Sequence, residues 1–154
     1  MFAVSRTRVS DHSPDHVNEA ILNEIEDNID YYASTGRGDL NQRLKELDYE
    51  WDIERALEAN ASVLALAGLT LGATVDRRWF AFPAVIAGFL LQHALQGWCP
   101  PVSVFRRMGI RTRNEIDYER YALKMIRGDF EETPEPSPGS TRTKAEEVLH
   151  DIRK

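Results

Sequence analysis

The chain has 154 residues, a formal net charge of −6, and 42% hydrophobic residues. Residues 11–36 carry seven acidic side chains and no Lys or Arg, which disfavours nucleic acid as a partner because such a face repels phosphate. The single cysteine, Cys99, excludes an intrachain disulfide framework and a cysteine-rich metal site. The sequence contains no P-loop, HExxH or GxSxG motif, so we expect neither an enzyme nor a cofactor.

The N-terminal region, residues 1–38, is expected to form an acidic helix followed by a loop. Ser13 and Pro14 are typical of a helix start, as a capping residue and a first-turn proline. Apolar side chains then recur at spacings of three and four residues, at Val17, Ile21, Ile25, Ile29 and Tyr32. This pattern predicts a helix that packs through one stripe, although the acidic surface could also meet a basic partner.

Two largely apolar segments dominate the middle of the chain, residues 56–75 and 79–97, and the triplet Asp76, Arg77 and Arg78 joins them. A helix of about 20 residues spans ~30 Å, which is the hydrocarbon thickness of a bilayer. The sequence therefore predicts an all-α fold built on a two-helix transmembrane hairpin, flanked by amphipathic cytoplasmic or interfacial helices. We assign residues 39–112 to this unit. A lead-in helix with apolar positions Leu40, Leu44, Leu47 and Trp51 is expected to run unbroken into the first span.

Small residues recur at four-residue spacing in both apolar segments, at Gly68, Gly72, Ala84 and Gly88. Such pairs allow two helix backbones to approach closely. If the hairpin turns at Arg77, Gly68 faces Gly88 or its neighbour Ala87. Gly72 then faces Ala84 or Pro83. The sequence thus predicts that the small faces of the two spans meet.

Polar residues occur near the end of the hairpin that holds both chain termini, at Glu58, Asn60, Ser62, Gln92, His93 and Gln96. Intramembrane polar groups suggest a binding or proton-handling site. They can equally serve as hydrogen-bonding contacts between helices, or line a conduit in an oligomer. A metal site is not expected, because His93 and Cys99 are only two ligands and zinc usually takes at least three from the protein.

The region after the second span begins with GWCP and continues into a short helix. Pro101, Phe105 and Met108 form a narrow apolar stripe with Arg106 and Arg107 beside it, which is typical of an interfacial helix.

Residues 113–130 are expected to form a further amphipathic helix. Thr112 and Glu115 form a capping box, and Gly128 supplies the stop. Its inward residues would be Ile116, Leu123 and Ile126. The last region, residues 131–154, is predicted to be a disordered linker and a short terminal helix.

The distribution of Lys and Arg predicts the orientation of the hairpin. The turn contributes only Arg77 and Arg78, whereas seven basic residues flank the spans: Arg43, Lys45, Arg55, Arg106, Arg107, Arg111 and Arg113. This imbalance favours a cytoplasmic location for both termini.

Residues 51–112 resemble the bacterial inner-membrane YgaP-like transmembrane domain family, a two-helix domain of uncharacterised function. The carrying residues are Asp52, Arg55, Gly97, Cys99, Pro100, Gly109, Ile110 and Thr112. The chain departs from the family pattern at Pro101 and Val102, where Leu-Tyr is common. The resemblance implies residence in the bacterial inner membrane and association into dimers. It does not imply the sulfur transfer of the rhodanese domains fused to some members, because Cys99 is not in a loop of backbone donors.

These observations favour a non-enzymatic, oligomerising membrane anchor or accessory subunit that presents cytoplasmic helices to partners. Membrane lipid and further copies or subunits of a membrane complex are the expected partners. One alternative is a thiol-based sulfur-handling or redox-sensing role for Cys99, which requires a lowered thiol pKa. Another alternative is a soluble helical interaction protein, because polar residues shorten the uninterrupted apolar runs.

Overall fold

A computed structural model describes residue 4 and residues 6–130, and all regular structure within them is helical. The elements in chain order are η1 (Ser10–His12), α1 (Asp15–Ser34), α2 (Arg37–Tyr49), α3 (Ile53–Thr74), η2 (Arg77–Phe80), α4 (Ala81–Gln96), α5 (Pro100–Arg107) and α6 (Arg113–Arg127). The all-α class is therefore confirmed. The expected linker and terminal helix of residues 131–154 lie outside the described residues.

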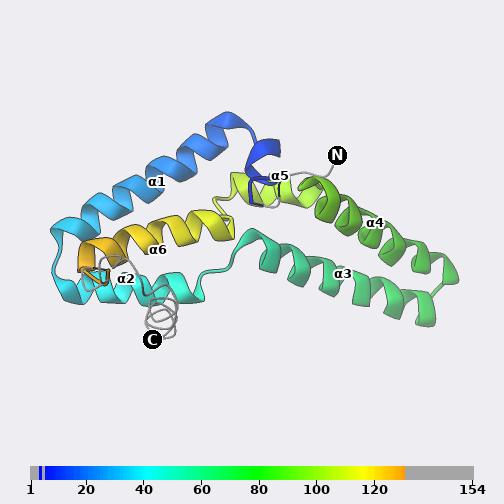
Figure 1. Cartoon of the computed structure of the whole chain (residues 1–154). Coiled ribbons are helices and arrows are strands. Elements are labelled where there is room, and N and C mark those ends of the chain that lie inside the picture. Colours follow the sequence, from blue (N-terminus) through cyan, green and yellow to red (C-terminus); the bar gives the residue numbers. More distant parts are fainter. Residues whose placement is uncertain (1–3, 5, 131–154) are drawn as a thin grey trace, which may run out of the picture.

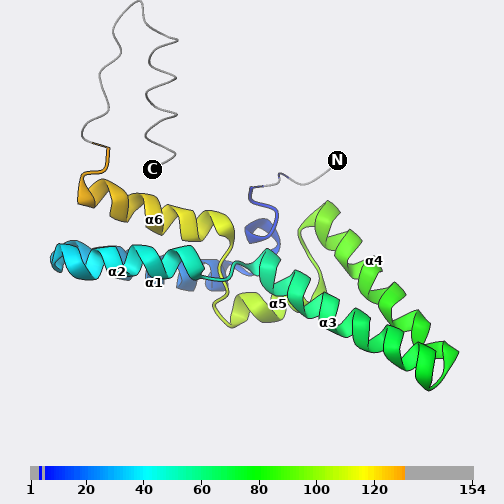
Figure 2. The ribbon, with the colours of Figure 1, turned by 90° about the horizontal axis from the view of Figure 1, so that it is seen from below.

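The molecule has two parts, which Figure 1 and Figure 2 show from two sides. Helices α1, α2 and α6 lie together at one end, and we call them the head. Helices α3 and α4, joined by η2, form a hairpin that projects away from the head. Helix α5 lies where the two parts meet.

The head is held together by the apolar stripes that the sequence predicts. Helix α1 buries Val17, Ile21 and Ile25, with Ile29 packed against them. The other cluster joins α2 to α6 and consists of Leu40, Leu44, Leu47, Ile116 and Leu123. The expectation for Ile126 was wrong, because its side chain is 45% exposed near the end of α6.

The hairpin differs from the head in what it exposes. By length and composition, two stretches are apolar enough to cross a membrane: Arg37–Thr74, whose apolar part lies in α3, and Arg77–Gln96, which comprises η2 and α4. The most apolar 18-residue stretches of the two candidate spans are only 22% and 6% buried. Large side chains such as Val63, Leu66 and Leu91 are more than 60% exposed. The apolar surface of the hairpin therefore faces outward instead of forming a core.

The lead-in helix does not run unbroken into the first span. Helix α2 ends at Tyr49, and α3 begins at Ile53 after an extended step at Glu50. Asp52 caps α3 by accepting a hydrogen bond from the backbone N–H of Arg55 at 2.8 Å. Trp51 at this step is half-exposed, so it does not complete the α2 stripe.

The two helices of the hairpin meet in a register different from the expected one. A Cβ on Gly68 would lie 2.8 Å from Cδ of Pro83, and a Cβ on Gly72 would lie 2.8 Å from the ring of Phe80. Gly88 would have no neighbour within 4 Å. The turn η2 sets this offset. Gly68 and Gly72 of α3 therefore contact Phe80, Phe82 and Pro83 at the start of the second span, and not Ala84 and Gly88.

The capping box of α6 is confirmed. The Thr112 hydroxyl accepts from the N–H of Glu115, and the Glu115 carboxylate accepts from the N–H of Thr112 at 2.7 Å. Gly128 ends the helix in the left-handed conformation, with φ of 91°. This geometry fixes the position of Glu115 at the first turn of α6, where α5 approaches.

The buried face of α5 is different from the predicted stripe. Its buried residues are Val102 and Arg106, whereas Met108 is 69% exposed. Val102 joins a small core with Val9, Ile53 and Cys99 at the base of the hairpin. The arginine expected at the side of this helix is instead one of the most buried side chains in the protein.

Candidate functional site

Three ion-pair groups fill the junction between the head and the hairpin. We define this junction by the segment 6–13, helix α5, and the loop 108–112 that leads into α6. Each group pairs a buried or half-buried cation with one or more carboxylates, and each includes a contact between residues more than 40 positions apart in the sequence. The junction therefore joins segments that the sequence keeps apart.

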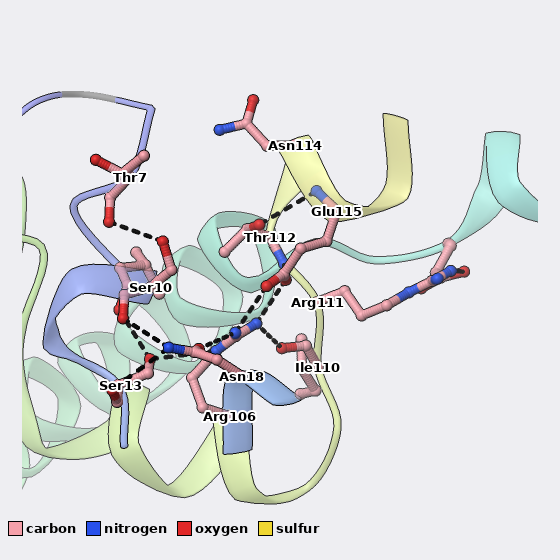
Figure 3. A network of polar contacts seen from close by, with 12 residues as sticks. Thr7, Ser10, Ser13, Asn18, Arg106, Ile110, Arg111, Thr112, Asn114 and Glu115 are labelled. Carbon is pink, nitrogen blue, oxygen red and sulfur yellow. Dashed lines mark hydrogen bonds and ion pairs between the residues drawn. The ribbon is translucent and has the colours of Figure 1, made fainter. Parts of the chain in front are cut away.

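Arg106 is the centre of the first group, and its side chain is almost fully buried. Its guanidinium donates to both carboxylate oxygens of Glu115, at 2.6 and 2.8 Å. It also donates to the side-chain oxygen of Asn18 at 2.8 Å and more weakly to Ser13 and to the carbonyl of Ile110. Figure 3 shows these contacts converging from α1, α5 and α6. One side chain thus fixes three helices relative to one another.

Arg111 is the centre of the second group, in the loop between α5 and α6. It donates to Glu50 at 2.7 Å and also pairs with Glu119, which is fully buried on α6. Arg43 of α2 completes this group by donating to Glu119 at 2.7 and 3.2 Å. The carbonyl of Arg111 accepts from the N–H of Ile53 at 2.9 Å, so the same residue anchors the start of the hairpin.

The third group lies at the base of the hairpin itself. Glu54 of α3 is 2.8 Å from Nε2 of His93 on α4 and accepts from Arg8 at 2.7 Å. His93 is buried, and its Nδ1 has no hydrogen-bond partner among the described residues. Gly97 adopts a left-handed φ of 78° directly beneath Arg8, where a Cβ would lie 2.4 Å from the Arg8 carbonyl. The N-terminal segment thus packs against the base of the hairpin, both where α3 begins and where α4 ends.

Ion pairing perturbs the pKa of Glu115 at the edge of the first group. Burial by itself would raise the pKa of this carboxyl. The hydrogen bonds from Arg106 and Thr112, together with the positive charge of Arg106, outweigh burial and lower the pKa below its usual value. Glu115 is therefore ionised throughout the neutral range, as a permanent partner of Arg106 and not as an acid or base.

The six polar residues predicted in the hairpin do not form one cluster. Of the six, only His93 is buried, and Gln92 is half-buried. The partner of His93 is Glu54, which is not a member of the predicted set. The other four residues are exposed, namely Glu58, Asn60, Ser62 and Gln96. Sequence reasoning missed Glu54 because its partners, Arg8 and His93, are 46 and 39 residues away along the chain.

Cys99 lies in the small apolar core at the base of the hairpin and is 2% exposed. Burial raises the pKa of its thiol, the hydrogen bond of the Val102 N–H lowers it by a smaller amount, and the nearby Glu54 carboxylate adds a still smaller increase. A raised pKa reduces the thiolate fraction at neutral pH. This environment does not favour the thiol-based alternative.

Several residues that carry the family resemblance shape turns or helix ends. Asp52 caps α3, Thr112 caps α6, and Pro100 begins α5. Gly97 and Gly109 both have positive φ, which favours glycine. Arg55 lies 4.4 Å from the centre of the Trp51 ring as a cation–π pair. These residues therefore set helix ends and turns in the fold.

The described residues contain no group of three or more His, Cys, Asp or Glu placed to hold a metal ion. The opposite charges of the junction neutralise one another in ion pairs. The chemical role of these ion pairs is to hold the helices in place. Together, the fold and the junction define a helical protein with two helices suited to crossing a membrane. No known protein family, curated protein or solved structure matches the chain, so the resemblance to the YgaP-like family stays a prediction.

Proposed function

We propose that the protein is a small integral membrane protein in which the α3–α4 hairpin is the anchor and the head presents helices to cytoplasmic partners. The observation that carries this proposal is the outward-facing apolar surface of the hairpin. Large side chains are exposed along both of its helices, including Val63, Leu66, Phe82, Phe89 and Leu91. Contiguous apolar surface of this kind marks a membrane or protein interaction site.

The contrast with the head supports lipid as the cover. In α1 and α2 the principal apolar stripes are buried and most of the charged side chains are exposed. Removing apolar surface from water is worth roughly 25 cal/mol per Å², so an isolated hairpin with this surface is strongly disfavoured in water. A bilayer removes that cost without any partner protein. In a soluble helical protein, the same helices would be expected to bury their apolar stretches inside the fold.

The junction supports a role as an anchor or accessory subunit. The ion pair of Arg106 joins α5 to the head, and the side chain of Arg111 pairs with Glu50 and Glu119. The Arg111 carbonyl accepts from the N–H of Ile53, which connects the same loop to the start of the hairpin. A domain held this firmly keeps a fixed position relative to the membrane. Such a fixed position suits a subunit that places its helices against a partner, and it requires no catalytic group.

Self-association is part of the same proposal. Gly88 and Ala84 on α4 are exposed, and Gly88 takes no part in the contact with α3. Small residues on an outer face of a membrane helix allow a second helix to approach closely. We therefore propose that α4 contributes to contacts between copies in the bacterial inner membrane.

The proposal is tested by extracting membranes from expressing cells with alkaline carbonate. We expect the protein to remain in the washed membrane. Replacing Val63 and Leu66 by Arg places two charges on the exposed face of α3, each costing about 2.5–3.5 kcal/mol at the centre of a membrane helix, and should release the protein or prevent its accumulation. Tyr49→Arg, at an 82% exposed site in the head, is the matched control and should stay in the membrane. Release of the wild-type protein into the supernatant would contradict the proposal.

A further inference from the structure

The tip of the hairpin carries a shallow groove that no intramolecular contact fills. It has a volume of about 390 Å³ and is lined by Arg78, Trp79, Ala81, Phe82 and Val85. The rings of Trp79 and Phe82 meet edge to face, with centroids 6.3 Å apart, and form one wall. The lining is thus mostly apolar, and Arg78 is its one charged residue.

The Arg78 guanidinium is free to bind a ligand. Within the described part of the chain, no side chain or carbonyl forms a hydrogen bond or ion pair with it. The nearby carboxylate of Asp76 accepts from the backbone N–H of Arg78 at 2.8 Å, and so caps η2. With Asp76, Arg77 and Arg78 all charged, the tip keeps one net positive charge.

The order of chemical groups along the groove matches that of a phospholipid. From Arg78 to Val85 the chain advances ~10 Å toward the middle of the hairpin. Over this distance the lining changes from a guanidinium, through the indole of Trp79, to the apolar side chains of Phe82 and Val85. Arginine binds phosphate through paired N–H donors, and Trp is typical of the headgroup layer.

We propose that the groove at the hairpin tip binds an anionic phospholipid, with Arg78 on the headgroup phosphate and an acyl chain along Phe82 and Val85. This inference rests on the proposed membrane insertion of the hairpin, which brings the tip to headgroup depth on the far side of the bilayer. Charge complementarity and continuity with the lipid-facing surface identify the occupant. Arg77, which does not line the groove, contributes only diffuse attraction.

Quenching of Trp79 fluorescence by brominated lipids tests this site. The full chain with Trp51→Phe and Trp98→Phe keeps Trp79 as its one tryptophan and is reconstituted into phosphatidylcholine vesicles. Phosphatidylglycerol or phosphatidylcholine brominated near the headgroup end of the acyl chain is then titrated in. We expect phosphatidylglycerol to quench at about fivefold lower mole fraction, the ratio that corresponds to about 1 kcal/mol for one arginine at an anionic surface.

Two variants of equal charge separate a site from general attraction. Arg78→Gln should reduce the fivefold preference to about one, whereas Arg77→Gln should keep most of it. Equal losses in the two variants, or equal quenching by both lipids in the parent protein, would overturn the lipid site and leave the membrane anchor intact. Absence of quenching by either lipid would overturn the membrane anchor and the lipid site together.

Discussion

At the scale of single residues, buried charge is what distinguishes this protein. Arg106, Arg111 and Glu119 are all at least 96% buried, and each has its charge matched by direct ion pairs. A buried charge is tolerated only with such partners, and removing one partner leaves the other uncompensated. The residues of the junction are therefore more sensitive to substitution than most apolar residues around them.

Arg106→Met should destabilise the protein by about 3–5 kcal/mol, because it removes the ion pair of the Glu115 carboxylate and the donor to the side-chain oxygen of Asn18. Arg107→Met is the matched control. Arg107 is exposed, and its replacement should change stability by no more than about 0.5 kcal/mol. The free energy of unfolding in detergent micelles, from denaturant titration followed by circular dichroism, measures both. Equal stabilities of the two variants would show that the Arg106 contacts contribute little.

The lowered pKa of Glu115 predicts an acid-dependent loss of stability. A carboxylate whose pKa is lower in the folded state contributes stability that is fully present above its unfolded pKa of about 4.3. This contribution is lost as the pH falls below the unfolded value and through the lower folded pKa. Glu115→Gln should be less stable at pH 7 and should show a smaller decrease between pH 5 and 3, measured as melting temperature. An unchanged pH profile in the variant would contradict this assignment.

At the scale of elements, the hairpin is set by its turn. Helix η2 offsets the two spans so that Phe80 and Pro83 lie on the glycines of α3, while Gly88 faces outward. The glycines have a defined role in the fold, because their missing side chains make room for the start of α4. Gly88 of α4 does not make room for α3 in this way, because a Cβ at that position would meet no atom within 4 Å.

Gly68→Leu together with Gly72→Leu should separate the helices of the hairpin. Added side chains would meet Pro83, Phe82 and Phe80 at less than 3.0 Å, and the proline ring cannot move aside easily. We expect a lower melting temperature in detergent. Gly88→Leu should leave melting unchanged and, if α4 mediates association, weaken crosslinking between copies. If Gly68→Leu/Gly72→Leu melts like the parent protein, the hairpin contact is not the one in the structure.

At the scale of the whole molecule, the protein consists of a head with buried apolar stripes and a hairpin with an exposed apolar surface, joined by a junction of ion pairs. The break at Glu50–Asp52 and the turn after α5 bring the head close to the base of the hairpin, where α3 begins and α4 ends (Figure 1). The N-terminal segment adds a third connection, through Arg8 and Glu54. Movements of the head are therefore expected to be transmitted to the base of the hairpin.

The predicted orientation, with both termini cytoplasmic, is tested by cysteine labelling in a Cys99→Ser background. Val75→Cys, near the hairpin tip and 69% exposed in the parent, should react with a membrane-impermeant maleimide added to spheroplasts. Tyr49→Cys in the head should react only after lysis. The opposite labelling pattern would reverse the orientation while leaving the anchor in place.

The sequence by itself determined the local features of the protein. Periodicity identified the stripes of α1, α2 and most of α6, length and composition identified the two apolar helices, and Thr112 with Glu115 and Gly128 identified the ends of α6. Each of these signals is contained within a few turns of one helix, so neighbouring residues are enough to express it. The position of Glu119 between Ile116 and Leu123 on the buried face of α6 was a further local signal of a buried charge.

Only the tertiary structure decided which side chains meet. The register of the hairpin depends on the geometry of η2, and the partners of Arg106, Glu54 and Glu119 come from segments up to 93 residues away. Periodicity can place a charged side chain such as Glu119 on a buried face, but it does not show which distant opposite charge that side chain meets. The burial of charged side chains is settled when the helices pack, because desolvation is tolerated only where the fold supplies the matching charge.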